Sequence, residues 1–303
     1  MKTIRPIEVM DRLSDLRRAG SLRGQPTGFR SLDRLISLRR GFPLFVAGAP
    51  GHGKSILVKQ IALNSARMHG WRTLAYMGEE GSGVDLIADL VEMFVGKDLR
   101  LQSPGGLENT LAMTDSEFEE ALIFVNDHFR VICPDEVPSP FTLEAFHDVA
   151  DSGHFDMTIL DPWNDLDHDF EKYGGREDVY LANALRDVRR KCRESDRLDI
   201  VVTHIGKIYA DRKTPEGKRY QGPAMPTEWA GGQTWFRRAF QMLLVYRPPS
   251  GIVLEEGGAP LPEGTAWIYC QKTKPKGVGA LGMAVLRWDK VTHRFEEIEG
   301  PRL

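Results

Sequence analysis

One stretch of eight residues constrains the fold of this chain more than any other. Gly48-Ala49-Pro50-Gly51-His52-Gly53-Lys54-Ser55 fits the pattern G-x-x-x-x-G-K-[ST]. A short apolar run at 44–47 precedes it, which is typical of a strand buried on both faces, and a helical spacing of apolar residues follows it over 54–69. Backbone N–H groups in such a turn, together with a helix N-terminus, favour an anion. The sequence therefore predicts a phosphate-binding loop.

Each residue type in this loop has a physical role. Lys54 is expected to reach the β- and γ-phosphates of a nucleotide, and the Ser55 hydroxyl is expected to ligate Mg²⁺. We therefore predict that all eight residues bind ATP, or another nucleoside triphosphate, as substrate, with Mg²⁺ as cofactor. The alternative is a glycine-rich turn with an incidental lysine, and the strand–loop–helix context argues against it.

Strand and helix patterns alternate along the rest of the chain. Strands are predicted at 73–77, 157–160 and 199–203, and helices at 84–96, 115–128, 142–151 and 176–195. Four more strands follow at 241–246, 266–270, 283–288 and 293–298. This order predicts an α/β fold in which a mainly parallel sheet is covered by helices on both faces and carries antiparallel strands at one edge.

The N-terminal residues have a different pattern. Apolar residues recur at helical spacing over 7–19, and residues 20–28 contain the glycine, serine and proline that are typical of a linker. We therefore divide the chain into a linker helix with its linker, 1–23, and an NTPase domain, 24–303.

Composition limits the location and the partners. The chain has 40 Lys and Arg against 43 Asp and Glu, so a nucleic acid would need a local basic patch. Its three cysteines are far apart, which argues against a zinc ribbon or a disulfide framework. No segment resembles a signal peptide or approaches the roughly 20 apolar residues that cross a bilayer. A cytoplasmic protein without a membrane partner is predicted.

Two further polar residues end predicted strands. Asp161 follows the apolar run 157–160, and we expect it to hold Mg²⁺ together with Ser55. His204 follows 199–203, where polar side chains of open α/β sheets lie near the ligand. We predict that His204 senses the γ-phosphate, and a purely structural histidine is the alternative.

Two consecutive glutamates follow the strand predicted at 73–77, which we expect to lie beside the phosphate-loop strand. Hydrolysis needs a group that orients and deprotonates the attacking water. We predict that Glu79 has this role and that Glu80 is solvated. That both are ordinary surface acids stays open, since a sequence does not show where a side chain points.

The segment 206–222 is basic and contains aromatic residues. Its five cations, Lys207, Arg212, Lys213, Lys218 and Arg219, outnumber its two acids, and glycines favour a mobile loop. Such a loop suits the phosphates of a single DNA strand, with base stacking as a supplement. A solvated charged loop is the alternative.

Two other segments have less specific patterns. The residues after Asp161 are acidic, at Asp165, Asp167, Asp169 and Glu171, so turn and capping roles are expected rather than a second metal site. Residues 235–238, Trp-Phe-Arg-Arg, predict a helix that buries both aromatic rings and exposes its arginines, with a pore element as the alternative.

The order of these parts resembles that of the RecA-fold ring helicases. The likeness is to the DnaB-type replicative family, especially the phage branch that is similar to the mitochondrial, Twinkle-like helicase. Besides the phosphate loop it is carried by 27–33 (TGFRSLD), 161–168 (DPWNDLDH), Thr203-His204 with Lys207, 228–237 (EWAGGQTWFR) and 271–276 (QKTKPK). It extends over about residues 24–298.

This resemblance implies a homo-hexameric or heptameric ring that hydrolyses nucleoside triphosphates at subunit interfaces and moves 5′→3′ on single-stranded DNA. It assigns Glu79 to the catalytic glutamate and His204 to the phosphate sensor. Residues 206–222 match a central DNA-binding loop, and 7–19 match a linker helix that docks on the adjacent subunit. A separate primase or loader is implied as a partner, and the cytoplasm of a bacterium or of a phage-infected host cell is implied as the location.

The resemblance also implies a contribution from the neighbouring subunit. Lys272 and Lys274 match a Lys-x-Arg pair that reaches into the neighbour's nucleotide site. Lys274 stands where the family has arginine, and it lacks the planar bidentate fork of a guanidinium. The alternative function is a RecA-like recombination or plasmid-replication ATPase that binds DNA without unwinding it.

Overall fold

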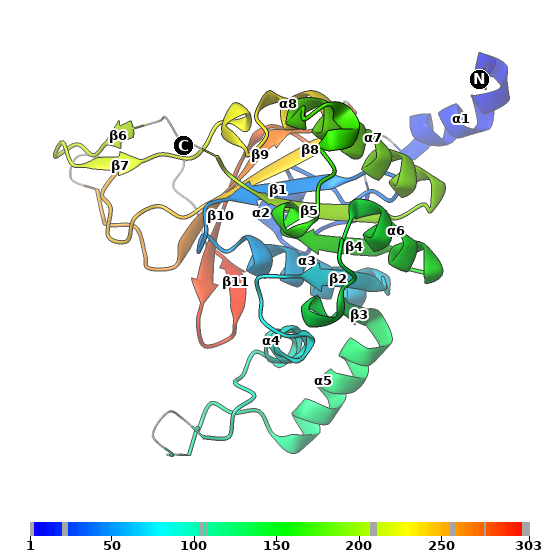
Figure 1. Cartoon of the computed structure of the whole chain (residues 1–303). Helices are drawn as coiled ribbons and strands as arrows, with labels where there is room; N and C mark the ends of the chain where they lie inside the picture. Colours follow the sequence, from blue (N-terminus) through cyan, green and yellow to red (C-terminus); the bar gives the residue numbers. More distant parts are fainter. Residues whose placement is uncertain are drawn as a thin grey trace.

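A nine-stranded sheet forms the centre of the part of the chain that the computed structural model describes, residues 3–19, 24–102, 106, 108–206, 211–254, 258–275 and 277–298 (Figure 1). The strand order is β11-β10-β9-β8-β1-β5-β4-β2-β3. The bounds are β1 (Leu44–Gly48), β2 (Thr73–Met77), β3 (Phe129–Ile132), β4 (Met157–Asp161), β5 (Leu198–His204), β8 (Gln241–Tyr246), β9 (Thr265–Lys272), β10 (Gly282–Asp289) and β11 (Arg294–Glu297). In this order, neighbouring strands from β8 through β1, β5, β4 and β2 to β3 are parallel. Neighbouring strands from β8 through β9 and β10 to β11 are antiparallel, so the predicted fold class is confirmed.

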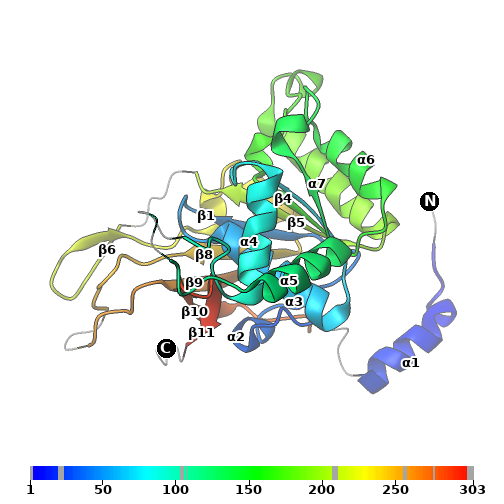
Figure 2. The ribbon, with the colours of Figure 1, turned by 90° about the horizontal axis from the view of Figure 1, so that it is seen from below.

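Helices cover both faces of the sheet because its central strands are apolar on both sides. In β1, Leu44 and Val46 join the core beneath α2 (Arg30–Asp33), α3 (Lys54–His69), α4 (Gly83–Val95) and α5 (Asp115–His128). Phe45 and Ala47 face the opposite core, beneath α6 (Leu143–Ser152), α7 (Glu177–Glu194) and α8 (Gln233–Arg238). Figure 2 shows α3, α4 and α5 grouped together, apart from α6 and α7. The 16 residues of α3 are closed by Gly70 in a left-handed C-cap.

One prediction about strand order is wrong. Strand β2 does not lie beside β1, because β5 and β4 are inserted between them. The connection through α3 carries the chain past two strand positions, and no local pattern encodes how far a crossover reaches. The carboxyl ends still meet at one edge, since Gly48 pairs with His204 and Met77 pairs with Asp161.

A small hairpin projects from the sheet on the left of Figure 1. It consists of β6 (Asp211–Lys213) and β7 (Arg219–Gln221), which pair antiparallel. The prediction of an irregular loop is therefore wrong for residues 211–213 and 219–221, because a short turn at Gly217 (φ 84°) lets the two arms pair. Residues 207–210 lie outside the described part of the chain.

The predicted N-terminal helix forms η1 (Pro6–Val9) and α1 (Met10–Ala19), which project from the sheet opposite the hairpin (Figures 1 and 2). Three of its apolar side chains, Ile7, Met10 and Leu13, are 63%, 54% and 52% exposed. The proposed boundary at residue 23 falls outside the described residues. Among those described, no helix is both long enough and apolar enough to cross a lipid bilayer.

The helix predicted over 235–238 buries one aromatic ring instead of two. Trp235 is fully buried and lies edge-on to Phe45, with ring centroids 5.2 Å apart, whereas Phe236 is 41% exposed. Successive side chains of a helix point in different directions. In α8, which is six residues long, Trp235 therefore faces the core and Phe236 points away from it.

Candidate active site

The glycine-rich turn lies between β1 and α3, as its sequence predicts. Gly51 and Gly53 have φ of 75° and 90°, in the left-handed region that favours glycine. A Cβ on Gly53 would also come within 2.9 Å of the Phe295 ring. Gly53 is the N-cap of α3 and no side chain caps it, so the first N–H groups of the helix remain available to an anion.

Lys54 is the first residue of α3 and is 5% exposed. Its Nζ donates to the Ala49 carbonyl at 3.3 Å, across the loop. Burial lowers the pKa of Lys54, and the nearby Asp161 and Glu79 carboxylates oppose that shift. An ammonium carries three donors, so this long hydrogen bond to Ala49 leaves it capacity to bind a phosphate.

Asp161 ends β4 and is 3% exposed. Burial raises the pKa of Asp161 to about 6, although the Ser55 hydroxyl and Lys54 stabilise its charged form. Its Oδ2 is buried and has no hydrogen-bond partner among the residues that the structure describes. A buried carboxylate oxygen without a partner, beside a serine hydroxyl, is a donor set that fits Mg²⁺. Ser55 and Asp161 would hold the ion.

Glu79 and His204 meet at the same edge of the sheet. His204 Nε2 lies 3.1 Å from Glu79 Oε1, although β2 and β5 are separated by β4. Glu79 is largely exposed, with 58% of its side chain accessible, whereas His204 is 23% exposed. The buried Nδ1 of His204 has no partner within the described part of the chain. In such a pair, a displacement of the imidazole can move the carboxylate, and a carboxylate can accept a proton.

The turn after β4 supports the contact between Glu79 and His204. It does so through Asn164, a residue to which the sequence analysis gave no role. The turn forms η3 (Trp163–Asp165), in which Asn164 Oδ1 accepts from Thr203 Oγ1 at 3.2 Å and from His204 N at 3.4 Å. Asp165 accepts from the Tyr76 hydroxyl at 2.6 Å. The polar run 161–168 was the only signal that could have indicated such contacts.

Of the other acids of this segment, Asp169 has a local turn role, as predicted, whereas Asp167 contacts a segment that is remote in the sequence. Asp167 accepts from the backbone of Phe141 at 2.7 Å, and Asp169 accepts from the backbone of Lys172 at 3.1 Å. Asp165 also explains the glycine that precedes the glutamates, because a Cβ on Gly78 would lie 1.8 Å from its carboxylate.

The prediction that Glu80 is solvated is wrong. Its carboxylate lies 2.8 Å from the ammonium of Lys59, a buried residue of α3. The sequence places these residues 21 positions apart, so no local pattern pointed to the ion pair.

Lys272 and Lys274 are not brought to the phosphate loop of their own chain. Lys272 pairs with Met242 at the amino end of β8, whereas the loop follows the carboxyl end of β1, which is parallel to β8. Its Nζ donates to the Phe236 carbonyl and lies 4.9 Å from the centre of the Phe236 ring. Burial, followed by the charge of Lys274, lowers the pKa of Lys272. Lys274 itself is exposed.

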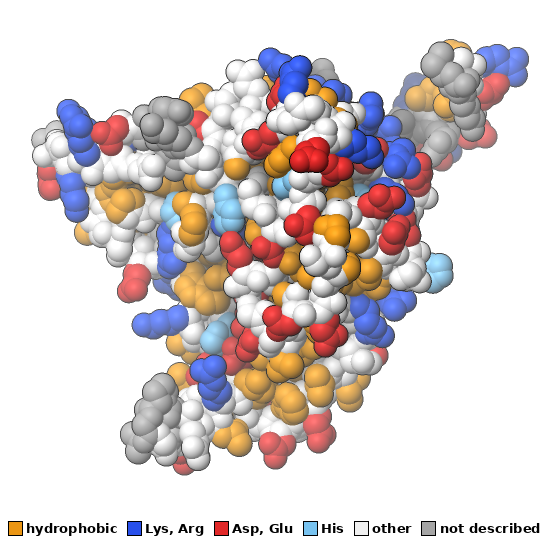
Figure 3. Space-filling model, viewed as in Figure 1, with side chains coloured by type: hydrophobic (Ala, Val, Ile, Leu, Met, Phe, Trp, Pro, Cys, Tyr) orange, Lys and Arg blue, Asp and Glu red, His pale blue; other side chains and the backbone are white. Residues whose placement is uncertain are grey.

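The predicted DNA-binding cations lie on the projecting hairpin. Its last residue, Gln221, accepts from the Tyr246 hydroxyl at 2.7 Å, and the Tyr246 ring lies 5.6 Å from the ring of His52 in the phosphate loop. The side chains of Arg212, Lys213, Lys218 and Arg219 are exposed, and Figure 3 shows Lys and Arg side chains at the hairpin on the left. Arg219 lies 3.4 Å from Asp211 in an exposed ion pair, which is a weak interaction. Lys207, the fifth predicted cation, lies outside the described residues.

A hollow of about 390 Å³ adjoins the phosphate loop at His52. Residues 247–250 and 261–265 form its other walls. The backbone of Arg247 donates to His52 Nδ1 at 3.3 Å, and burial lowers the pKa of His52. The volume suits a base and sugar. Sequence reasoning assigned His52 to the loop but missed Arg247, for which the Pro-Pro turn after β8 was the only signal.

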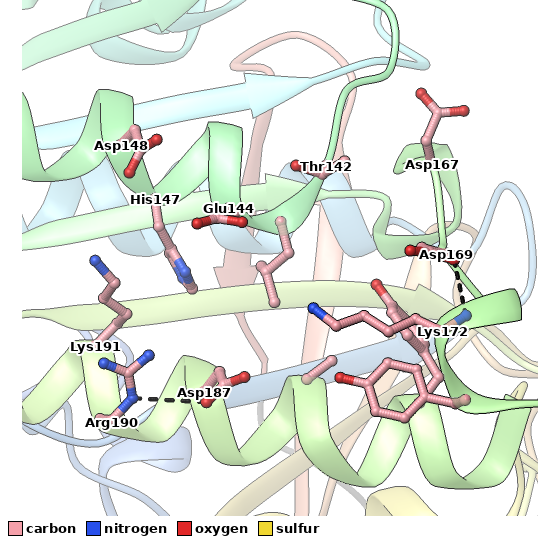
Figure 4. A pocket seen from close by; sticks show the side chains of 14 residues that line it. Thr142, Glu144, His147, Asp148, Asp167, Asp169, Lys172, Asp187, Arg190 and Lys191 are labelled. Atoms are coloured by element: carbon pink, nitrogen blue, oxygen red, sulfur yellow. Dashed lines mark hydrogen bonds and ion pairs between the residues drawn. The ribbon is translucent and has the colours of Figure 1, made fainter.

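A second hollow, of about 420 Å³, lies between α6 and α7 (Figure 4). None of the predicted site residues lines it. Its charges largely pair with protein groups, since Arg190 lies 3.6 Å from Asp187 and the backbone of Lys172 donates to Asp169. This hollow is therefore separate from the candidate site residues at the carboxyl ends of the strands.

Comparison with known proteins is consistent with this geometry. No family model matches the chain. The chloroplast and mitochondrial Twinkle homologue of Arabidopsis thaliana is 24% identical over 282 residues, which cover 90% of this chain and 36% of that protein. The chain thus spans little more than a third of the length of this curated relative.

Solved structures share the fold at lower identity. A DnaB-like replicative helicase, described with its interactions with primase, has a TM-score of 0.73 and 15% identity, over 98% of this chain and 68% of that one. A second structure, of an ATPase domain, has a TM-score of 0.76 and 14% identity, over 98% and 100%. RadB recombinase has a TM-score of 0.55 and 18% identity, over 90% and 99%. These comparisons confirm a RecA-like ATPase fold and the resemblance to DnaB-type and Twinkle-like helicases.

Proposed function

We propose that this chain is the motor of a replicative DNA helicase that hydrolyses a nucleoside triphosphate and moves 5′→3′ along single-stranded DNA. The observation that carries the proposal is the convergence of Lys54, Glu79, Asp161 and His204 at one edge of the sheet. A buried cation, a buried carboxylate with an unpartnered oxygen, and an exposed carboxylate linked to a histidine are the parts that phosphoryl transfer to water needs.

Each residue has a role in the proposed reaction. Lys54 and the backbone of the glycine-rich turn bind the β- and γ-phosphates. Ser55 and Asp161 would hold Mg²⁺, which would neutralise charge on the phosphates. Glu79 orients the attacking water and accepts its proton, and His204 contacts the γ-phosphate. The hollow beside His52 takes the base and sugar.

We further propose that the active form is a homo-hexameric or heptameric ring. Two features support assembly. Lys272 and Lys274 lie at the edge of the sheet opposite their own phosphate loop, so they would serve the site of another copy. The apolar face of α1 is exposed on the isolated chain, and burying it against an adjacent copy would stabilise the assembly. The domain division at residue 23 follows from this role of α1.

Single-stranded DNA is the proposed polymer substrate. The hairpin β6–β7 exposes its Lys and Arg side chains to solvent. A row of exposed cations can bind the phosphates of single-stranded DNA with little preference for base sequence. The proposed place of action is the cytoplasm. A separate primase or loader is the proposed protein partner, and the DnaB-like helicase structure that was described with its interactions with primase supports it.

The second candidate is a recombination or plasmid-replication ATPase that binds DNA without unwinding it. The likeness to RadB recombinase over 90% of the chain favours it, because the same fold serves both functions. An unwinding assay on a forked duplex separates the two candidates.

The central test is phosphate release stimulated by single-stranded DNA. The wild-type chain should hydrolyse ATP, and Lys54→Ala should lower the rate by at least about 100-fold, since it removes a charge that stabilises the transition state. Lys290→Ala, an exposed lysine of the β10–β11 turn, is the matched control. Equal hydrolysis by Lys54→Ala would refute the site, and hydrolysis without unwinding would favour the second candidate.

A further inference from the structure

Lys59 is a buried cation near the proposed active site to which that site gives no role. It lies on α3 five positions after Lys54, and 4% of its side chain is exposed. Its Nζ lies 2.8 Å from Glu80 Oε2 and 2.6 Å from Asp89 Oδ2. Because Asp89 belongs to α4, this clamp joins the phosphate-loop helix, the turn after β2 and the next helix.

The charge of Lys59 is held by its partners. Burial by itself would lower the pKa of Lys59, but the carboxylates of Glu80 and Asp89 outweigh that effect and raise it. A buried ammonium with two carboxylates at short range has little freedom to change partners. The position of Glu80 is therefore fixed relative to α3.

The turn that follows β2 is tight. The strand ends at Met77, and the backbone N–H of Glu80 donates to the Met77 carbonyl at 3.3 Å. Gly78 N also donates to the Asp161 carbonyl at 2.9 Å, which ties the turn to β4. In so short a turn, Glu79 cannot point in the same direction as Glu80, whose side chain is held by Lys59. Glu79 accordingly meets His204 at 3.1 Å.

We infer that Lys59 is a positioning residue which decides which of the two consecutive glutamates is the general base: by holding Glu80 against α3 and α4, it directs Glu79 to His204 and the attacking water. This inference rests on the proposed hydrolytic function. It also explains how α3, which begins at the phosphate loop, keeps the base in register with the phosphates, since Lys54 and Lys59 belong to one rigid helix.

The experiment compares the two carboxylate partners of Lys59. Glu80→Gln and Asp89→Asn each remove one ion pair of the same lysine, but only Glu80 adjoins the base. With ATP and single-stranded DNA, Glu80→Gln should lower kcat about fivefold, as expected for the loss of one charge-assisted contact, and leave KM unchanged. Asp89→Asn should keep kcat within about twofold of the wild type while lowering Tm to a similar extent. Glu79→Gln should lower kcat by at least about 100-fold.

A second comparison separates positioning from folding. Lys59→Met should lower kcat in the wild-type background but have no further effect in a Glu79→Gln background, since a positioning residue acts only through the group that it positions. Binding of a fluorescent nucleotide checks that each variant is folded. If Lys59→Met does not fold, the comparison of Glu80→Gln with Asp89→Asn still decides.

Three results would overturn the inference. If Glu80→Gln abolished turnover as fully as Glu79→Gln, Glu80 would be as essential as the assigned base. Equal kcat values for Glu80→Gln and Asp89→Asn would show that the clamp only stabilises the fold, as would an undiminished effect of Lys59→Met in the Glu79→Gln background. A wild-type chain without any hydrolysis would instead refute the proposed function, so the two failures are distinguishable.

Discussion

His204 Nε2 lies 3.1 Å from Glu79 Oε1, although the two residues are 125 positions apart and their strands are not adjacent in the sheet. The contact spans β4, whose last residue is Asp161. A ligand that displaces the histidine would therefore also move the carboxylate, which would couple the proposed phosphate contact to the position of the proposed base.

This coupling predicts the effect of removing the imidazole. His204→Ala should lower kcat for DNA-stimulated ATP hydrolysis by about tenfold to 100-fold, because both the phosphate contact and the support of Glu79 are lost. Steady-state kinetics with KM and kcat determined separately provide the measurement. The exposed His154→Ala is the control and should resemble the wild type. An unchanged kcat for His204→Ala would assign the histidine a structural role.

Asp161→Asn should impair the use of Mg²⁺ more than nucleotide binding. The unpartnered Oδ2 belongs to a carboxylate whose charge would stabilise the ion, and an amide supplies no such charge. We expect at least about a tenfold weaker affinity for the ion in the nucleotide complex, consistent with loss of a coordinating group. Titration with Mn²⁺ followed by electron paramagnetic resonance measures it. Asp169→Asn, on the exposed turn beyond η3, should leave the ion affinity intact.

Neutralising the hairpin should weaken binding to single-stranded DNA in a salt-dependent manner. For Arg212→Ala combined with Lys213→Ala, the slope of log K against log salt should fall by about 0.7 for each lost phosphate contact. Fluorescence anisotropy at several salt concentrations checks this. A slope equal to that of Lys290→Ala would place the DNA on another surface.

Charging the exposed apolar side chains of η1 and α1 should prevent assembly. Ile7→Asp and Leu13→Asp place carboxylates on side chains that are 63% and 52% exposed, so the isolated chain should still fold. Light scattering after gel filtration should show a ring for the wild type and smaller species for these variants. Asp15→Ala, an exposed position of the same helix, should assemble normally. Intact rings in both charged variants would contradict the role of α1.

Asp151 should make stability depend on pH in acid. Burial tends to raise the pKa of Asp151, but hydrogen bonds from Lys191 and Arg197 outweigh it and lower the pKa to about 2. A lowered pKa stabilises the fold above the unfolded value of 3.8, and this contribution is lost as pH falls through about 2. Asp151→Asn should cost on the order of 1 kcal/mol at pH 7, allowing for its partial exposure and solvent screening.

Thermal unfolding of Asp151→Asn and the wild type, measured from pH 7 to pH 2, checks this prediction. The difference in Tm should be largest at neutral pH and should shrink between about pH 4 and pH 2. A difference that is the same at all these pH values would show that the carboxylate charge does not contribute.

The parts of the site that lie within one element were predictable from sequence. The strand, turn and helix around Lys54 follow from local residue types, because a buried strand, a glycine turn and an amphipathic helix each have a short-range pattern. The strand-end positions of Asp161 and His204 were predictable for the same reason. Strand order was not, as the wrong placement of β2 beside β1 shows, since it depends on how far a crossover reaches.

The contacts between distant elements could not be predicted. Lys59 pairs with Glu80 and Asp89. Asn164 accepts two hydrogen bonds from the end of β5. No sequence periodicity relates the residues that make these contacts. The hairpin at 211–221 was also missed, because its arms are three residues long and carry charges instead of an alternating apolar pattern.

By itself, the sequence determined that this chain has a glycine-rich loop between a strand and a helix, a mainly parallel sheet and polar residues at the strand ends, because these features follow from neighbouring residues. Only the tertiary structure decided that Glu79 faces His204 while Glu80 is held by Lys59, and that Lys272 lies away from its own loop. The physical reason is that the direction of a side chain depends on packing between elements that are remote in the chain.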